Sequence, residues 1–177
     1  MDTPAHPLAR AAAAIDALSE WTGRVIAWLT VGMVFTTFAV VVLRYVFDLG
    51  WIAMQESVIF QHALVFLLGA AYTLKHEGHV RVDIFYKKLP PRGQALVDLL
   101  GTLLLLFPVC GFILWASWDY VADAWAIHEG SREAGGLPGV YLLKTAIPLM
   151  AVLLMIQGLA LVMRSLLGVL GLDEARG

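Results

Sequence analysis

The residues of this sequence that could carry ion or proton chemistry lie beside long apolar stretches. Gln55 and Glu56 stand at the start of one such stretch, and His62 follows one and a half helical turns later. A carboxylate inside a membrane usually marks an ion or proton path, but at the edge Glu56 could instead pair with Arg44 or bind backbone amides. A lone histidine is more often a hydrogen-bonded interface residue than a ligand. We therefore interpret Gln55, Glu56 and His62 as candidate interface residues between subunits.

A second group of ionisable residues is acidic and precedes the last apolar stretch. Its members are Asp119, Asp123, Glu129 and Glu133. Residues 131–139, SREAGGLPG, contain the glycines and the proline that are typical of a flexible loop. Two interpretations stay open: a solvated loop, or a surface that docks a protein partner outside the membrane.

No pattern in the sequence indicates an enzyme. The chain contains no P-loop, HExxH or GxSxG motif. Its five histidines do not place two axial ligands in the middle of different apolar stretches, which disfavours a haem-carrying anchor. The single cysteine, Cys110, lies in an apolar run and is interpreted as a small buried residue. We predict no catalytic, substrate-binding or metal-binding residue and no cofactor.

The composition indicates a membrane protein. Hydrophobic residues make up 60% of the chain and charged residues 15%, whereas soluble domains carry about 25% charged residues. Four stretches lack Asp, Glu, Lys and Arg, namely 25–43, 57–74, 99–118 and 145–163. A spanning helix needs about 20 apolar residues, and lipid requires internal bonding of the backbone. We therefore predict an all-α membrane protein with one domain and four transmembrane helices. The expected spans are residues 25–46, 54–74, 96–118 and 141–166.

Pro108 and Pro148 lie inside the third and fourth of these stretches. Proline removes a helical hydrogen bond, so we predict a kink in each helix, supported by neighbouring protein.

The segment before the first span predicts a short amphipathic helix on the inner membrane surface. Leu8, Ile15, Leu18 and Thr22 recur at helical spacings, with Ala11 between them. Acidic residues within the segment disfavour a cleaved signal peptide. We interpret the first span as an uncleaved anchor.

The distribution of basic residues predicts the orientation of the chain. An even number of spans places both termini on one side, and nine of the twelve Lys and Arg residues fall on that side. Five of them lie in residues 74–93, between the second and third spans. Cytoplasmic segments carry the excess of Lys and Arg. We therefore expect both termini and this loop in the cytoplasm.

Residues 79–92 of that loop predict a short amphipathic helix in the inner interface. A stripe at i, i+3, i+4 and i+7 consists of Val82, Phe85, Tyr86 and Leu89. Asp83 and Lys87 are an i, i+4 ion pair in the favoured order, and Pro90 follows the stripe. Residues 80–84 also alternate like a strand, but a strand in the interface would leave its edges unpaired.

Aromatic and basic side chains are expected to fix the depth of the chain in phospholipid. The expected outer anchors are Trp51, Trp115, Trp118 and Trp125. The expected inner anchors are Arg81, Lys87, Lys88 and Arg92, which face anionic headgroups. The basic run is thus interpreted as a topology signal, and no nucleic acid is expected as a partner.

The run WIAMQESVIFQHALVFLLGAAYTLKHEGHVRVDIFYKKLPPRG resembles the small membrane subunit of TRAP (tripartite ATP-independent periplasmic) transporters. The matching features are Trp51, Glu56, the small-residue segment 68–71, the H-[IV]-x-V-D stretch at 79–83, and Leu89-Pro90. One feature departs from the family pattern: many members have two adjacent acids after the Trp, where this chain has Gln55-Glu56 after a longer gap.

The resemblance implies a four-helix subunit of a bacterial inner-membrane transporter. Its partners would be a large membrane subunit that moves like an elevator, and a periplasmic binding protein that delivers an organic acid. Substrate and sodium sites would lie in the large subunit. The small subunit would act as a static brace and offer part of the docking surface for the binding protein.

Two other functions stay open at this point. The chain could be a self-sufficient four-helix exporter with Glu56 as proton carrier, although such proteins are shorter and place the acid in the middle of the first helix. It could also anchor a respiratory enzyme to the membrane and bind a quinone or haem.

Overall fold

The computed structural model describes residues 6–172, and all regular structure in that range is helical. Its elements are α1 (Pro7–Val46), α2 (Ile52–Lys75), the 3-10 turn η1 (Tyr86–Lys88), α3 (Pro91–Gly101), the π-helix η2 (Thr102–Leu106), α4 (Phe107–Ala126) and α5 (Val140–Leu170). Because α3, η2 and α4 follow one another without a break, this range contains four helical rods that are long and apolar enough to cross a membrane. The predicted all-α membrane fold is confirmed.

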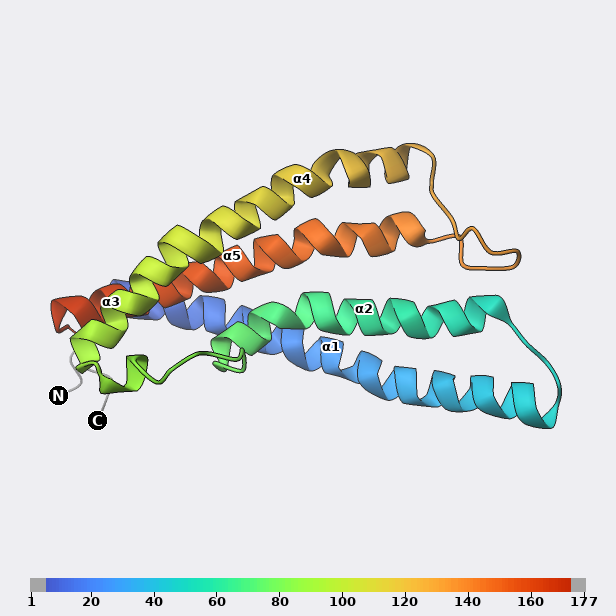
Figure 1. Cartoon of the computed structure of the whole chain (residues 1–177), viewed down its shortest axis with the longest axis horizontal. Coiled ribbons are helices and arrows are strands. Elements are labelled where there is room, and N and C mark those ends of the chain that lie inside the picture. Colours follow the sequence, from blue (N-terminus) through green and yellow to red (C-terminus); the bar gives the residue numbers. More distant parts are fainter. Residues whose placement is uncertain (1–5, 173–177) are drawn as a thin grey trace.

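The four rods form two helical hairpins (Figure 1). α1 and α2 make one hairpin, and the run from α3 to α4 makes the other with α5. The start of α1, the connection from α2 to α3 and the end of α5 lie together at what we call the inner end. The connections 47–51 and 127–139 lie at the opposite, outer end.

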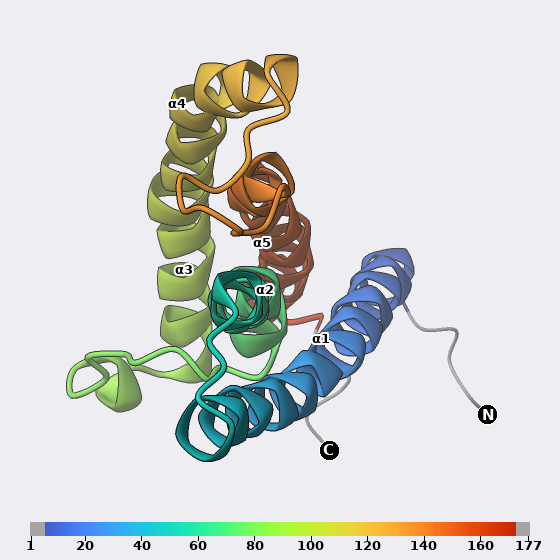
Figure 2. The same ribbon diagram turned by 90° about the vertical axis from the view of Figure 1, so that its right-hand side faces the viewer.

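α5 is the central helix of the bundle. It contacts α1, α2, α3 and α4 (Figure 2), and it continues through Pro148. Its buried face consists largely of small residues, namely Ala146, Ala151, Gly158, Ala160 and Ser165. Small side chains allow helices in a membrane to approach closely, so this face can serve several neighbours.

α1 includes the N-terminal segment for which the sequence predicts a separate surface helix. At about 1.5 Å per residue the helix is roughly 60 Å long, about twice the apolar thickness of a bilayer. Its buried side near the inner end consists of Ala12, Ser19 and Gly23 rather than the predicted stripe. The separate helix was a wrong prediction because Asp16 and Glu20 find partners in other helices, which keeps this part of α1 in the bundle.

The segment between α2 and α3 is an irregular loop with one 3-10 turn, so the predicted helix over residues 79–92 was wrong. Figure 2 shows the loop projecting from one side of the bundle, and Val82 is 84% exposed. The predicted ion pair between Asp83 and Lys87 is present, at 2.5 Å.

Two side chains of the loop explain why it is not helical. Arg81 and Tyr86 both bind the carboxylate of Asp98 in α3. Residues five apart point about 140° away from each other on an α-helix, so a helix could not bring both to one carboxylate. The bonds to Asp98 therefore select the irregular loop over the amphipathic pattern.

At Pro108, where the sequence predicts a kink, the structure has the π-helical turn η2 just before the proline. The Phe107 N–H bonds the Thr102 carbonyl, one residue further back than in an α-helix. Proline has no N–H to donate, and π turns often occur beside bends and functional sites. α5 approaches this turn at Gly158, where a Cβ would lie 2.7 Å from Leu106 and 2.8 Å from Phe107.

We expect Gly23→Ala to destabilise the packing of α1 on α2. A Cβ at residue 23 would lie 2.7 Å from Tyr72 Cβ, so one helix must shift. Overpacking of this kind costs about 1–3 kcal/mol. The melting temperature of the purified chain in detergent should therefore fall.

The matched control is Gly69→Ala, because a Cβ at residue 69 meets no atom within 4 Å. Alanine is the better helix former, so this variant should melt at the same temperature or higher. Equal melting temperatures of the two variants would contradict the close contact of α1 and α2.

Candidate functional site

At the outer end, Glu56 holds the 127–139 loop against the start of α2. Its carboxylate accepts hydrogen bonds from the Ser131 hydroxyl and, at 2.7 Å, from the Leu137 N–H. The Ser131 N–H also bonds the Leu137 carbonyl, at 2.9 Å. Of the two contacts considered for Glu56 within the chain, the bond to a backbone amide is therefore confirmed. Among the described residues Glu56 forms no ion pair with Arg44.

Glu129 joins the end of α4 to the start of α5. Its carboxylate accepts a 2.5 Å hydrogen bond from Lys144, whose ammonium lies 3.8 Å from the centre of the Tyr120 ring. Beside this pair, Trp125 donates to the Thr145 hydroxyl at 2.8 Å. Glu129 and Trp125 thus have partners within the chain, and both stabilise the second hairpin.

The other predicted acidic residues remain on the surface. Asp119, Asp123 and Glu133 are exposed, and the described structure gives them no ion pair. Arg132 is exposed next to Glu133. The sequence analysis treats the four acids as one group. In the structure Glu129 is bound to Lys144, and only the other three are exposed to a partner protein.

Most of the predicted anchors and interface residues are exposed on the surface of the bundle. Trp51, Trp115 and Trp118 are exposed near the outer end, where such side chains fit an interfacial role. His62 is exposed on α2 and Gln55 is half-buried. At the inner end all four predicted basic anchors are exposed, and two of them, Arg81 and Lys87, also have carboxylate partners.

A polar network that the sequence analysis missed joins α1 to α5 near the inner end. The Gln157 side chain is 1% exposed, and its amide oxygen accepts a 2.6 Å hydrogen bond from Ser19. Its amide nitrogen donates to Asp16 at 2.9 Å, and Asp16 also accepts from Arg164. A side-chain amide that is buried without a hydrogen-bond partner is costly. The single glutamine in the last span could therefore have predicted that polar groups of another helix bind it.

A second inner cluster joins α1 to the end of α2 around Glu20, which precedes the uncharged stretch. The Glu20 carboxylate lies 2.5 Å from Lys75, 2.9 Å from His76 and 2.9 Å from Arg24. The hydrogen bonds from Lys75 and His76 lower the pKa of Glu20 to about 2, from an ordinary value of 4.5. Glu20 is therefore ionised at neutral pH and fixes the inner end of the first hairpin.

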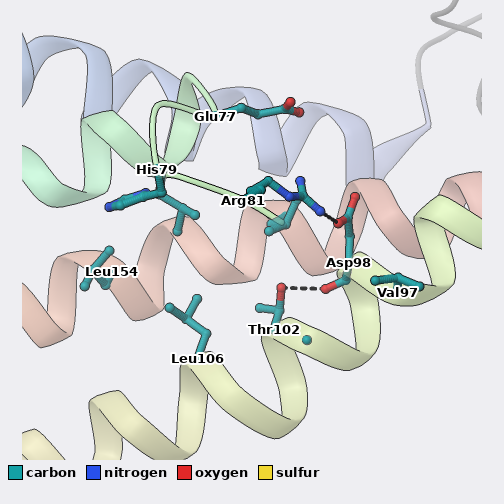
Figure 3. Close-up of a pocket in the computed structure, with 11 residues that line it drawn as sticks. Glu77, His79, Arg81, Val97, Asp98, Thr102, Leu106 and Leu154 are labelled. Carbon is teal, nitrogen blue, oxygen red and sulfur yellow. Dashed lines mark hydrogen bonds and ion pairs between the residues drawn. The ribbon is translucent and has the colours of Figure 1, made fainter. Parts of the chain in front are cut away.

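A third inner cluster attaches the projecting loop to α3 (Figure 3). Arg81 donates to one oxygen of Asp98 at 2.6 Å, and the Tyr86 hydroxyl donates to the other at 2.7 Å. The Arg81 guanidinium lies 4.2 Å from the centre of the Tyr86 ring. Burial and the hydrogen bond to Asp98 raise the pKa of Tyr86, so it remains a donor at neutral pH.

Each of these clusters joins two helices, or a loop and a helix, through side-chain hydrogen bonds, so each stabilises the fold. Within residues 6–172, no three His, Cys, Asp or Glu side chains are placed to hold a metal ion. The described arrangement thus consists of contacts between helices and of exposed surfaces at the two ends.

Comparison with known proteins assigns the chain to a family. Residues 33–168, more than half of the chain, match the family model of the DctQ component of tripartite ATP-independent periplasmic (TRAP) transporters. The chain belongs to this family. It is therefore a TRAP small permease subunit, not an enzyme, and a multi-pass protein of the inner membrane.

Two curated relatives carry names from the same family. A "C4-dicarboxylate TRAP transporter small permease protein DctQ" from Vibrio cholerae is 30% identical over 106 residues, 59% of this chain and 44% of the relative. A "Putative TRAP transporter small permease protein" from Haemophilus influenzae is 33% identical over 78 residues, 44% of this chain and 48% of the relative. The chain thus spans less than half the length of either relative. No solved structure matches the chain.

We expect Glu56→Ala to loosen the outer loop. The substitution removes the acceptor for Ser131 and for the Leu137 N–H, and hydrogen bonds to charged groups contribute about 1.5–3 kcal/mol. Hydrogen exchange of amides in residues 131–138 should therefore accelerate roughly tenfold or more. Mass spectrometry of the deuterated, proteolysed chain measures this rate.

Glu133→Ala is the control, because Glu133 is exposed in the same loop and its side chain holds no other segment. Exchange in that variant should match the parent chain. Unchanged exchange in Glu56→Ala would show that Glu56 does not hold the loop.

Proposed function

We propose that this chain is the stationary subunit of a TRAP transporter, bracing a larger membrane subunit and helping to dock a periplasmic binding protein during ion-coupled uptake of an organic acid. The observation that carries the proposal is how the polar side chains are used. In the described range every buried polar side chain has a hydrogen-bond partner within the chain. Gln157 binds across helices and Glu56 binds the outer loop. Ion coupling, with sodium, is therefore assigned to the large partner subunit.

A brace must keep its own shape while its neighbour moves. Each end of this bundle has carboxylates that join segments distant in sequence: Glu56 and Glu129 at the outer end, and Asp16, Glu20 and Asp98 at the inner end. Between the ends, the outward faces of α1 and of the rod formed by η2 and α4 are apolar, with Trp28, Phe35, Leu105 and Phe112 all exposed. These faces suit a large membrane subunit and lipid.

The proposed orientation places the inner end, with both termini, in the cytoplasm. The fold gathers the start of α1, residues 76–90 and the end of α5 at this end. Nine of the twelve Lys and Arg residues fall on the same side in sequence, and cytoplasmic segments carry that excess. Lys88 and Arg92 are then exposed to anionic headgroups.

This orientation makes the outer end periplasmic. Asp119, Asp123 and Glu133 then present negative charge to the binding protein, and a basic patch on that protein would complement them. An organic acid is proposed as the substrate class because the relative from Vibrio cholerae has C4-dicarboxylate in its name. The exporter and the respiratory anchor are set aside, because the chain belongs to the TRAP family.

We expect uptake into proteoliposomes only when this chain, the large membrane subunit and the binding protein are all present. Reversal of the exposed charges by the triple change Asp119→Lys, Asp123→Lys and Glu133→Lys should raise the concentration of binding protein needed for half-maximal uptake. Exposed ion pairs contribute about 0.2–1 kcal/mol each, which predicts a rise of roughly tenfold at low salt. The rise should shrink at high salt, because exposed charges are screened.

Asp83→Lys is the control, since it reverses an acidic residue at the inner end. It should leave the requirement for binding protein unchanged. Uptake by this chain alone would refute the bracing role, and an unaltered salt-sensitive requirement in the triple variant would refute the docking surface.

A further inference from the structure

A groove with an apolar part and a polar part runs between α5 and the rod formed by α3 and η2, beneath residues 77–81 of the loop (Figure 3). The apolar part is a hollow of about 400 Å³ between Leu106, Leu154 and Leu161 on the helices and the polar side chains of Glu77, His79 and Arg81 on the loop. The polar part is a hollow of about 580 Å³ that adjoins it, since Glu77, Asp98 and Leu161 line both. Each volume lies within the range of about 300–1,000 Å³ that is typical of ligand sites.

The polarity of the groove changes along the helix axes. On α5, Leu154 and Leu161 line the apolar hollow, and Arg164 and Gly168 line the polar one. The opposite wall also becomes more polar toward the inner end. Leu106 of η2 lines the apolar hollow, and Arg92 and Gln94 of α3 line the polar one. On its helix walls the groove is therefore apolar toward the middle of the bundle and more polar at the inner end, and loop residues 77–81 cover the apolar part.

The length of the groove matches one leaflet of a bilayer. From Leu154 to Gly168 the α5 wall rises roughly 21 Å, at about 1.5 Å per residue. One leaflet with its headgroups is about 20–22 Å thick, half of the about 40–45 Å of a whole bilayer. A lipid whose chain lies on the leucines would place its headgroup beside α3 and the end of α5.

Most of the charges along the groove are already neutralised within the chain. Asp98 is paired with Arg81, and Arg164 is paired with Asp16. Within residues 6–172, Arg92 and Glu77 are the two charged lining residues with no ion pair or side-chain hydrogen bond. The Arg92 guanidinium lies beside Gly171 of the opposite wall, where a Cβ would lie 2.8 Å from its Nη2.

One cation and one anion at the mouth of an apolar groove complement a zwitterionic headgroup. We propose that a single phosphatidylethanolamine molecule occupies the groove, with an acyl chain on Leu106, Leu154 and Leu161. Its phosphate binds Arg92, because guanidinium groups match phosphate oxygens. Its primary ammonium binds Glu77. An anionic lipid such as phosphatidylglycerol satisfies Arg92 alone.

A helix of a partner protein fits the groove less well. An apolar helix side along the leucines would also have to place polar groups against both Arg92 and Glu77, because a charge buried without a partner is costly. A phospholipid has an apolar acyl chain and a charged headgroup, which together extend over the length of one leaflet and match the two parts of the groove. The proposal needs only that the inner end lies at a membrane surface, so it does not rest on the proposed function.

Titration of the delipidated, full-length chain with phosphatidylethanolamine and with phosphatidylglycerol tests the proposal, with bound lipid counted by native mass spectrometry. Phosphatidylethanolamine should saturate at one molecule per chain and bind more tightly than phosphatidylglycerol. Arg92→Gln should weaken binding of both lipids about fivefold, since one basic residue near a headgroup contributes about that factor. Glu77→Gln should abolish the preference for phosphatidylethanolamine.

Lys88→Gln is the matched control, because Lys88 is an exposed basic residue of the inner end that does not line the groove. Leu154→Trp, which fills the apolar hollow, should abolish the single-lipid stoichiometry while Arg92 is intact. Equal binding by Arg92→Gln and Lys88→Gln, or equal affinity of the parent chain for the two lipids, would overturn the proposal. So would loss of the bound lipid on assembly with the large subunit, because that subunit would then fill the groove.

Discussion

Lipid offers polar side chains no hydrogen-bond partner, so the polar groups of this bundle must bind one another. Within residues 6–172 no buried side-chain nitrogen or oxygen lacks a partner. Gln157 shows the consequence most clearly, because it binds Ser19 and Asp16 of α1 from the middle of the most buried helix. The inner part of α1 must therefore stay helical and lie against α5, which accounts for the length of that helix.

The same requirement explains why the contacts at the ends of the bundle differ from those in its middle. Carboxylates near the ends of the rods bind segments that are far apart in sequence: Asp16 with Arg164, Glu56 with Leu137, and Asp98 with Arg81. Along the middle of the bundle small residues bring the helices close, and the few polar side chains there, such as Gln157 and Gln61, bind a hydroxyl of the neighbouring helix. The outward faces of the bundle are exposed and largely apolar, so they are available to lipid and to other subunits.

The sequence predicts the helices better than it predicts the hydrogen bonds and ion pairs that join them. Uncharged stretches locate the four rods because the cost of charge in lipid is local and large. These bonds are not local: Ser19 and Gln157 are 138 residues apart, and Arg81 and Asp98 are 17 apart. The loop after α2 was misread because its stripe at helical spacing is a local signal, whereas the bonds of Arg81 and Tyr86 to Asp98 depend on the fold.

The claim that this subunit stands still is tested most directly by the distance between its two hairpins during transport. Spin labels at Leu49→Cys and Ile127→Cys, both exposed, would mark their outer ends, in a Cys110→Ala background that removes the native free thiol. Double electron–electron resonance on the complex with the large subunit then gives the distribution of label distances. The account predicts one distribution that sodium, substrate and binding protein leave unchanged. A second distance that appears with substrate would contradict it, because the hairpins would then move with the transport step.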